Sequence, residues 1–166
     1  MKKTALSVLL LALLTACASN KPKPEEQTAA APAAAPAATQ TAVVDPLDDP
    51  NNADLQKRSA YFPFDVDAVQ DADKPMIEAH GKYLKYRPSR NVRVEGNCDE
   101  RGSNEYNLAL GQRRANNVKK ALVTAGAKAE QVSTVSYGED KPVATGHDED
   151  SWKQNRRADL NYKAGK

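Results

Sequence analysis

Residues 94–122 read VEGNCDERGSNEYNLALGQRRANNVKKAL and predict a strand, a polar loop and a long helix in succession. The strand begins slightly earlier, because the segment NVRVEG at residues 91–96 alternates valine with charged residues, the period of a half-buried strand. We expect the helix to begin at about Ser103 and to end before Gly126. Its apolar stripe is Leu108, Gly111, Ala115, Val118 and Leu122. The small residues in this stripe indicate that the helix approaches the sheet closely.

The segments on either side of this unit complete the predicted fold. SAYFPFD at residues 59–65 reads as a strand, in which Pro63 indicates an edge or a bulge. A helix follows, with Asp73 as its cap, and it stops before Pro88. Residues 131–138 and 157–163 supply two more strands, separated by a loop with a short helix near its end. The order β-α-β-α-β-β predicts an α+β sandwich, a mixed sheet with two main helices on one face.

The first of these helices also carries a histidine. Its apolar face consists of Met76, Ile77, His80, Tyr83 and Leu84. Because His80 lies on this face at helical spacing, we interpret it as a hydrogen-bonded core residue rather than as a ligand or a base.

The beginning of the chain predicts export and lipidation. Two lysines precede an apolar run at residues 5–14, which is shorter than the ~20 residues that span a bilayer. Residues 1–16 are therefore interpreted as a signal peptide. Residues 14–17, LTAC, resemble the lipobox of bacterial lipoproteins, which implies acylation of Cys17. The residue after Cys17 is Ala18 and not aspartate, and in this the sequence resembles lipoproteins that are released to the outer membrane. We therefore expect an outer-membrane lipid anchor and a folded domain in the periplasm.

Composition separates a tether from a folded domain. Residues 17–54 contain the lipidated Cys17 and a stretch rich in proline and alanine, which buries too little apolar surface to fold. The folded domain is expected at residues 55–166. Removal of the two signal-peptide lysines brings the formal charge from +2 to zero, which argues against nucleic acid as a partner. If lipid occupies Cys17, Cys98 has no partner for a disulfide.

The loop GNCDERG at residues 96–102 and the helix after it carry the candidate chemistry. Ligands bind beside the carboxyl ends of strands in open α/β layers. Asn107 and Arg114 lie two turns apart beside the apolar stripe, and Asp99 lies in the loop. An anion at Asp99 and a cation at Arg114 with space between them suit a zwitterionic ligand, and the planar fork of arginine can bind a carboxylate through two hydrogen bonds. Spacing alone leaves open that the two side chains simply pair with each other or brace the loop.

A family resemblance adds to this interpretation. The pattern N-x-x-L-G-x-x-R-A-x-x-V-x-x-x-L at residues 107–122 resembles the peptidoglycan-binding motif of OmpA-like C-terminal domains. Together with YFPFD, VEGNCDERG, VSYGEDKP, GHDE and NRRA, it is similar to the peptidoglycan-associated lipoproteins of the Tol-Pal system, over about residues 61–162.

The resemblance implies non-covalent binding of the peptidoglycan stem peptide through meso-diaminopimelate, and no enzymatic activity or cofactor. It implies that Asp99 takes the ammonium group of that residue and Arg114 its side-chain carboxylate. It further implies a groove lined by Phe64, Asp65, Arg101, Asn107 and Leu110. Implied partners are TolB, which should compete with the wall for the groove, then TolA and other outer-membrane wall-binding proteins.

The sequence departs from the family pattern at three positions. Asn97 replaces a common histidine, Cys98 replaces alanine or threonine, and Pro63 replaces glycine. We expect binding to survive the change at residue 97, since an amide side chain can still hydrogen-bond the loop.

Other functions remain as alternatives. One is a generic OmpA-like wall tether without Tol partners. Another is a thiol hydrolase acting on the wall, with Cys98 as nucleophile and His80 or His147 as base. The acidic run at residues 147–150 lacks the ligand spacing of a metal site and is expected to be a solvated loop.

Overall fold

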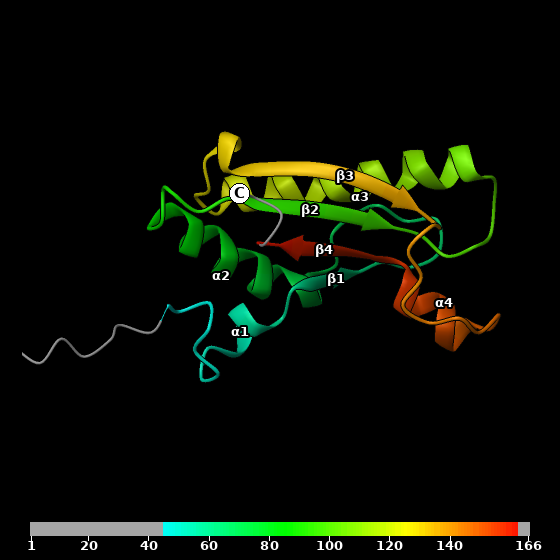
Figure 1. Ribbon diagram of the computed structural model, residues 1–166, viewed down its shortest axis with the longest axis horizontal. Helices are drawn as coiled ribbons and strands as arrows, with labels where there is room; N and C mark the ends of the chain where they lie inside the picture. The colour runs from blue at the N-terminus through cyan, green and yellow to red at the C-terminus, as the bar shows by residue number, and fades with distance from the viewer. Residues whose placement is uncertain (1–44, 163–166) are drawn as a thin grey trace, which may run out of the picture. The chain divides into compact units, whose positions relative to one another are not determined.

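The computed structural model describes residues 45–162 (Figure 1). The predicted signal peptide, the lipidation site Cys17 and most of the predicted tether lie outside these residues. The helices are α1 (Ala53–Gln56), α2 (Lys74–Lys85), α3 (Asn104–Thr124) and α4 (Glu149–Asn155), with 3-10 turns at Asp71–Asp73 and Ala129–Gln131. The strands are β1 (Ser59–Tyr61), β2 (Val92–Asn97), β3 (Val132–Gly138) and β4 (Arg157–Asn161).

The four strands form one mixed sheet in the order β1-β4-β2-β3. β4 pairs antiparallel with both β1 and β2, whereas β2 and β3 are parallel. The α+β class and the order of strands and main helices are confirmed. The parallel pair requires a crossover connection, which is α3. Because β2 leads directly into this crossover, the loop after β2 and the first turns of α3 meet at one end of the sheet (Figure 1).

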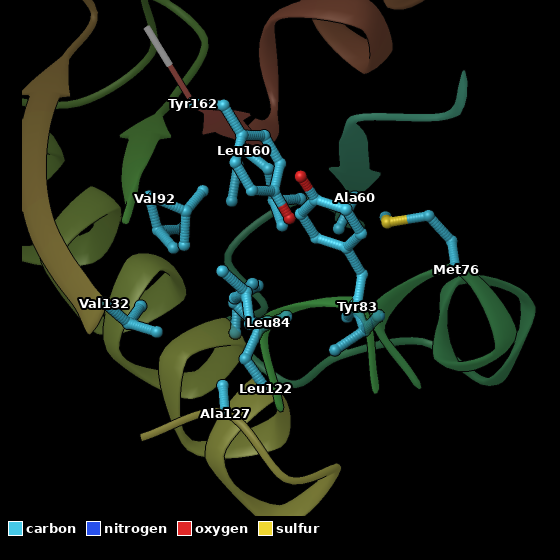
Figure 2. Packing of buried hydrophobic residues seen from close by; sticks show 14 of the residues in the cluster. Ala60, Met76, Tyr83, Leu84, Val92, Leu122, Ala127, Val132, Leu160 and Tyr162 are labelled. Atoms are coloured by element: carbon cyan, nitrogen blue, oxygen red, sulfur yellow. The ribbon is translucent and has the colours of Figure 1, made fainter. Parts of the chain in front are cut away.

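The core lies between the sheet and the helices. Figure 2 shows Leu84 of α2 and Leu122 of α3 near the strand residues Val92 and Leu160, all of them buried. The predicted apolar face of α2 is buried throughout. His80 belongs to this core, as predicted, and its two ring nitrogens lie 2.8 Å from the Tyr162 hydroxyl and from the Lys57 carbonyl oxygen.

Two glycines let α3 approach β2 closely, as the small residues in its stripe predicted. A Cβ atom at Gly96 would overlap the carbonyl group of Gly111, and one at Gly111 would overlap the Ser136 hydroxyl. The backbone contact between Gly96 and Gly111 thus fixes the height of the helix above the sheet. Side chains on the neighbouring turns of α3 can therefore reach the end of β2.

Two local predictions are wrong and one holds only in part. The first strand ends at Tyr61 and not at residue 65, because the chain turns after Phe62 and Asp65 adopts a positive φ of 56°. Asp73 occupies the N-cap position of α2, but its side chain makes no capping bond, since its carboxylate accepts a hydrogen bond from the Tyr61 amide at 2.8 Å instead. Leu108 is 37% exposed and so lies outside the buried stripe of α3, whereas Leu110, which the predicted stripe omitted, is buried.

The packed part of the chain begins before residue 55. Leu47 and Leu55 are both buried in the main core. Asp45 accepts hydrogen bonds from the Tyr83 hydroxyl at 3.1 Å and from Arg90 at 2.6 Å. Residues 45–56 therefore lie against α2. Within residues 45–162, no helix has the length and apolar character needed to cross a membrane.

Candidate ligand-binding site

A cavity of about 190 Å³ lies where the loop after β2 meets the first turns of α3. Its walls contain all seven residues that the sequence predicted for the groove. The lining residues are Phe64, Asp65, Cys98, Asp99, Arg101, Gly102, Tyr106, Asn107, Leu110, Arg114 and Arg156. They come from the turn after β1, the loop after β2, the N-terminal half of α3 and the residue before β4. Segments that are distant in sequence thus build one site.

Arg114 forms part of the floor of this cavity and is 0% exposed. Its Nε donates to the Val66 carbonyl oxygen at 2.9 Å and one Nη donates to the Pro63 carbonyl oxygen at 3.1 Å. The other Nη donates to the Asn97 carbonyl oxygen at 3.0 Å and to the Cys98 sulfur at 3.4 Å. These bonds join the turn after β1 to the end of β2. Arg114 thus braces the loops around the cavity, which is one of the alternatives that the spacing had left open.

The charge of Arg114 has no carboxylate partner among the described residues, since all its acceptors are carbonyl oxygens or sulfur. Burial lowers the pKa of the guanidinium, which nevertheless stays protonated, as arginine does in proteins. An unpaired buried charge is costly and is characteristic of functional sites. The floor of the cavity therefore favours an anionic group.

Asp99 lies on the same cavity and is 4% exposed. Its carboxylate accepts hydrogen bonds from the Arg101 side chain at 2.6 Å and 3.2 Å and from Arg156 at 3.1 Å. Burial alone would raise the pKa of Asp99, but the hydrogen bonds from Arg101 and Arg156 hold it below its ordinary value. Asp99 is therefore ionised at neutral pH.

Asp99 and Arg114 do not bond to each other in the structure, so a direct pair, one of the alternatives left open by their spacing, is not formed. They line one cavity, as the sequence predicted. The anion is nevertheless not free, because two arginines already surround it. The site thus carries more positive than negative charge on its floor, which spacing within residues 94–122 did not reveal.

The rim of the cavity is accessible and partly aromatic. Phe64 is 56% exposed, and the Arg101 guanidinium lies 4.1 Å from the centroid of its ring and 4.0 Å from that of Trp152. The Tyr106 hydroxyl donates to the Asp65 carboxylate. Pro63 does not remove the turn from the groove, since Phe64 and Asp65 both line it. Arg101 is the partly exposed side chain that covers Asp99.

Sequence reasoning missed Arg156, although the NRRA segment at residues 155–158 was noticed as a motif. Its Nε donates to the Phe62 carbonyl oxygen at 3.0 Å, and one Nη bonds Glu149 at 2.5 Å. With the bond to Asp99, this buried arginine joins the turn after β1, the loop after β2 and α4. The two adjacent arginines at the start of the last strand were the only feature of the sequence that could have pointed to Arg156.

Cys98 and the histidines are not arranged as a catalytic pair. The Cys98 thiol lies 3.3 Å from the Asn107 carbonyl oxygen and burial raises its pKa, which disfavours the thiolate. His80 bonds Tyr162 and Lys57, and His147 bonds Glu100 at 2.7 Å. In residues 45–162, no three or more His, Cys, Asp or Glu side chains are grouped to hold a metal ion.

Asn97 is buried beside the cavity without lining it. Its Nδ2 donates to the Glu95 carbonyl oxygen at 3.0 Å, whereas its Oδ1 is buried without a hydrogen-bond partner among the described residues. Its carbonyl oxygen accepts from Arg114. Residue 97 therefore supports the site through its backbone rather than by entering the cavity.

Comparison with known proteins is consistent with this fold. The model of the OmpA family matches residues 61–156. The peptidoglycan-associated lipoprotein of Pasteurella multocida is 51% identical over 111 residues, which is 66% of this chain and 74% of the relative. The protein of the same name from Pseudomonas putida is 39% identical over 158 residues, 95% of each chain. A crystal structure of the peptidoglycan-associated lipoprotein from Burkholderia pseudomallei is 54% identical, with a TM-score of 0.69, and covers 71% of this chain and 99% of that one.

Proposed function

The chain belongs to the OmpA family and, within it, to the peptidoglycan-associated lipoproteins, and we propose from this that it links the outer membrane to the cell wall. Lipid on Cys17 anchors the chain in the outer membrane, and the domain in the periplasm binds peptidoglycan without a covalent bond. The names of its relatives support association with peptidoglycan. The chain acts as a binding protein and not as an enzyme.

The ligand that we propose for the cavity is the meso-diaminopimelate residue of the stem peptide. One observation carries this assignment: Arg114 is a buried cation that has no carboxylate partner among the described residues. A ligand carboxylate next to Arg114 would supply that partner. The ammonium group on the same carbon would then lie beside Asp99. Amino-acid heads with both charges fit this arrangement better than sugars, which carry neither on their rings.

Binding requires the rim to open. Asp99 and Arg114 are buried, whereas Arg101 is partly exposed and forms the cover over Asp99. The ligand ammonium can replace Arg101 at the Asp99 carboxylate, because both groups are cationic hydrogen-bond donors. Glu149 lies 3.7 Å from the Arg101 guanidinium and can hold it after this exchange. The exchange keeps two cations at Asp99, so the carboxylate is not left short of a partner when Arg101 moves.

Co-sedimentation with purified peptidoglycan sacculi tests wall binding. The full chain should pellet with sacculi, and Asp99→Ala and Arg114→Ala should each lose about 2–5 kcal/mol of affinity, because each leaves a desolvated charge without its partner. Arg113→Ala is the matched control, since Arg113 is the neighbouring residue on α3 and bonds the exposed Asp67 instead. Equal pelleting of all variants would contradict the proposal.

We assign the chain to the Tol-Pal system with TolB as its direct partner and TolA as a further one. The alternative is a wall tether without Tol partners, and a pull-down with TolB separates the two. TolB should be retained by the full chain, and stem peptide should release it if the wall and TolB share the groove. Failure of TolB to bind a chain that still binds sacculi would leave the simpler tether.

A further inference from the structure

Arg114 cannot bind a carboxylate through a two-bond fork in the observed conformation. A guanidinium has five N–H groups. The bonds to Val66, Pro63, Asn97 and Cys98 use all of them except one on a single Nη. The bidentate geometry that arginine often shows would require Arg114 to give up one of these bonds. A ligand carboxylate with two oxygen atoms therefore needs a second donor in the cavity.

Arg156 is the side chain in the cavity that can supply this donor. It is buried and uses one N–H on each nitrogen, for Phe62, Asp99 and Glu149. One N–H on each Nη is left without an acceptor among the described residues. The amide of Asn107 is already engaged by the Asp99 carbonyl oxygen at 3.2 Å and by Glu139 at 2.5 Å. Arg156 thus has free donors where Asn107 has none.

The two guanidinium groups are close enough to affect each other. Both guanidinium groups line the same cavity, and like charges repel. The pKa of Arg114 is lowered mainly by burial and also by the charge of Arg156, whereas the charge of Asp99 raises it. Asp99 is bonded to Arg156 and to Arg101 but not to Arg114. An anion in contact with both Arg114 and Arg156 would relieve this repulsion, because it attracts both cations. This position is also next to Asp99, where the ammonium group belongs.

We propose that the ligand carboxylate bridges Arg114 and Arg156, accepting one hydrogen bond from each, while its ammonium group binds Asp99. This assignment rests on the proposed function and adds Arg156 as a ligand-binding residue. The ligand class is an amino-acid head with an ammonium and a carboxylate on one carbon. Arg156 then favours ligands that carry the carboxylate. It holds Asp99 in place for any cationic ligand, but it contacts the ligand itself only when a carboxylate is present to accept its hydrogen bond.

Two peptides and one substitution test this assignment. The ligands are a synthetic stem peptide with meso-diaminopimelate and the same peptide with lysine, which keeps the ammonium group but lacks the carboxylate. Calorimetric titration of the full chain measures both affinities. Arg156→Gln should weaken the diaminopimelate peptide roughly ten- to hundredfold, the loss of one charged hydrogen bond, and change the lysine peptide much less. Arg157→Gln is the control, because Arg157 is equally buried but pairs with Asp159 outside the cavity.

The outcomes separate the possible roles of Arg156. Equal loss for both peptides would show that Arg156 only positions Asp99 and would overturn the proposal. Unchanged affinity for both would overturn it too. If the wild-type chain binds neither peptide, the proposed function itself fails. If it prefers the diaminopimelate peptide but Arg156→Gln does not alter that preference, only the role of Arg156 fails.

A second measurement uses the wild-type chain, so that the test does not depend on whether the Arg156→Gln variant folds. Nitrogen-15 NMR spectra resolve arginine side chains, and spectra of Arg156→Lys and Arg114→Lys assign the two signals. Addition of the diaminopimelate peptide should shift the side-chain signals of both arginines. A shift of Arg114 alone would contradict the bridging carboxylate.

Discussion

The Arg156 guanidinium lies 3.1 Å from the Asp99 carboxylate, and neither side chain is more than 6% exposed. Both charges are therefore inside the protein, where removal of one leaves the other with only a more exposed partner, Arg101 for Asp99 and Glu149 for Arg156. The same pair that prepares the binding site also holds together the loop after β2 and the residue before β4. Residues of the site should thus affect folding as well as binding.

Asp99→Asn should lower the free energy of unfolding by about 1–3 kcal/mol, because Arg156 loses its buried carboxylate partner and keeps only Glu149, whose side chain is 62% exposed. Urea unfolding followed by circular dichroism measures the loss. Asp150→Asn is the control, since Asp150 pairs with Lys153 on the surface and should change the free energy by less than about 1 kcal/mol. Similar values for both variants would show that the Asp99–Arg156 pair contributes little to folding.

Gly96→Ala should destabilise the protein by about 3 kcal/mol, because the new methyl group would overlap the carbonyl group of Gly111 on α3. The helix would have to move away from β2 and carry Arg114 with it, so ligand affinity should fall as well. Chemical denaturation gives the first effect and peptide titration the second. Gly146→Ala is the control, because the only close atoms there belong to the flexible Ser151 and Asp148 side chains. A fully stable Gly96→Ala protein would refute the close approach of helix and strand.

The periodicity of the sequence predicted most of the fold for a physical reason. Valine alternation in β2 and the apolar stripe of α2 follow from which face is buried, and both were confirmed. The end of β1 could not be predicted in this way. The turn after Tyr61 is held by Arg114 and Arg156, whose bonds to it span 48 to 94 residues of sequence. Local patterns carry no information about such partners.

Mild acid should destabilise the protein through His80. Burial lowers the pKa of His80, so the unfolded chain takes up a proton near pH 6.5 while the folded chain does not. The stabilisation from neutral His80 is thus present above pH 6.5 and is lost as the pH falls toward the folded pKa. The bond to Glu100 raises the pKa of His147 and acts in the opposite direction, so the His147→Gln chain is the right background.

In that background, the free energy of unfolding at pH 5 should be smaller than at pH 7. Addition of His80→Gln should remove most of this difference, since the chain has only two histidines. Urea unfolding at the two pH values measures it. An unchanged pH difference in the double variant would assign the effect to carboxylates instead.

Cys98 should react slowly with thiol reagents in the folded protein. It is buried against α3, and burial raises its pKa and so reduces the thiolate fraction. The experiment uses the full chain with Cys17→Ser, so that Cys98 is the only thiol. The rate at which Cys98 reacts with the reagent should rise sharply when urea unfolds the protein. Fast reaction of the native thiol would revive the hydrolase alternative. Mass analysis of muropeptides incubated with the same protein would then decide whether bonds are cleaved.

The site was predictable in membership but not in electrostatics. The loop after β2 and the start of α3 adjoin in sequence, so Asp99, Asn107 and Arg114 could be placed near one another, whereas Phe64 and Asp65 in the turn after β1 were named only through the family resemblance. The pairing of Asp99 with Arg156 depends on β4 lying next to β2, which the sequence order does not specify. The bonds of Arg114 to backbone carbonyl oxygens also join residues that are distant in sequence, so the number of its remaining N–H donors could be counted only in the structure.

A crystal structure of the chain with a bound stem peptide tests the central claim most directly. The account predicts that the diaminopimelate carboxylate lies within hydrogen-bond distance of Arg114 and that its ammonium group lies at Asp99. It also predicts that Arg101 has turned away from the Asp99 carboxylate. A peptide bound with its charged head elsewhere on the domain, with Arg101 still covering Asp99, would contradict the account.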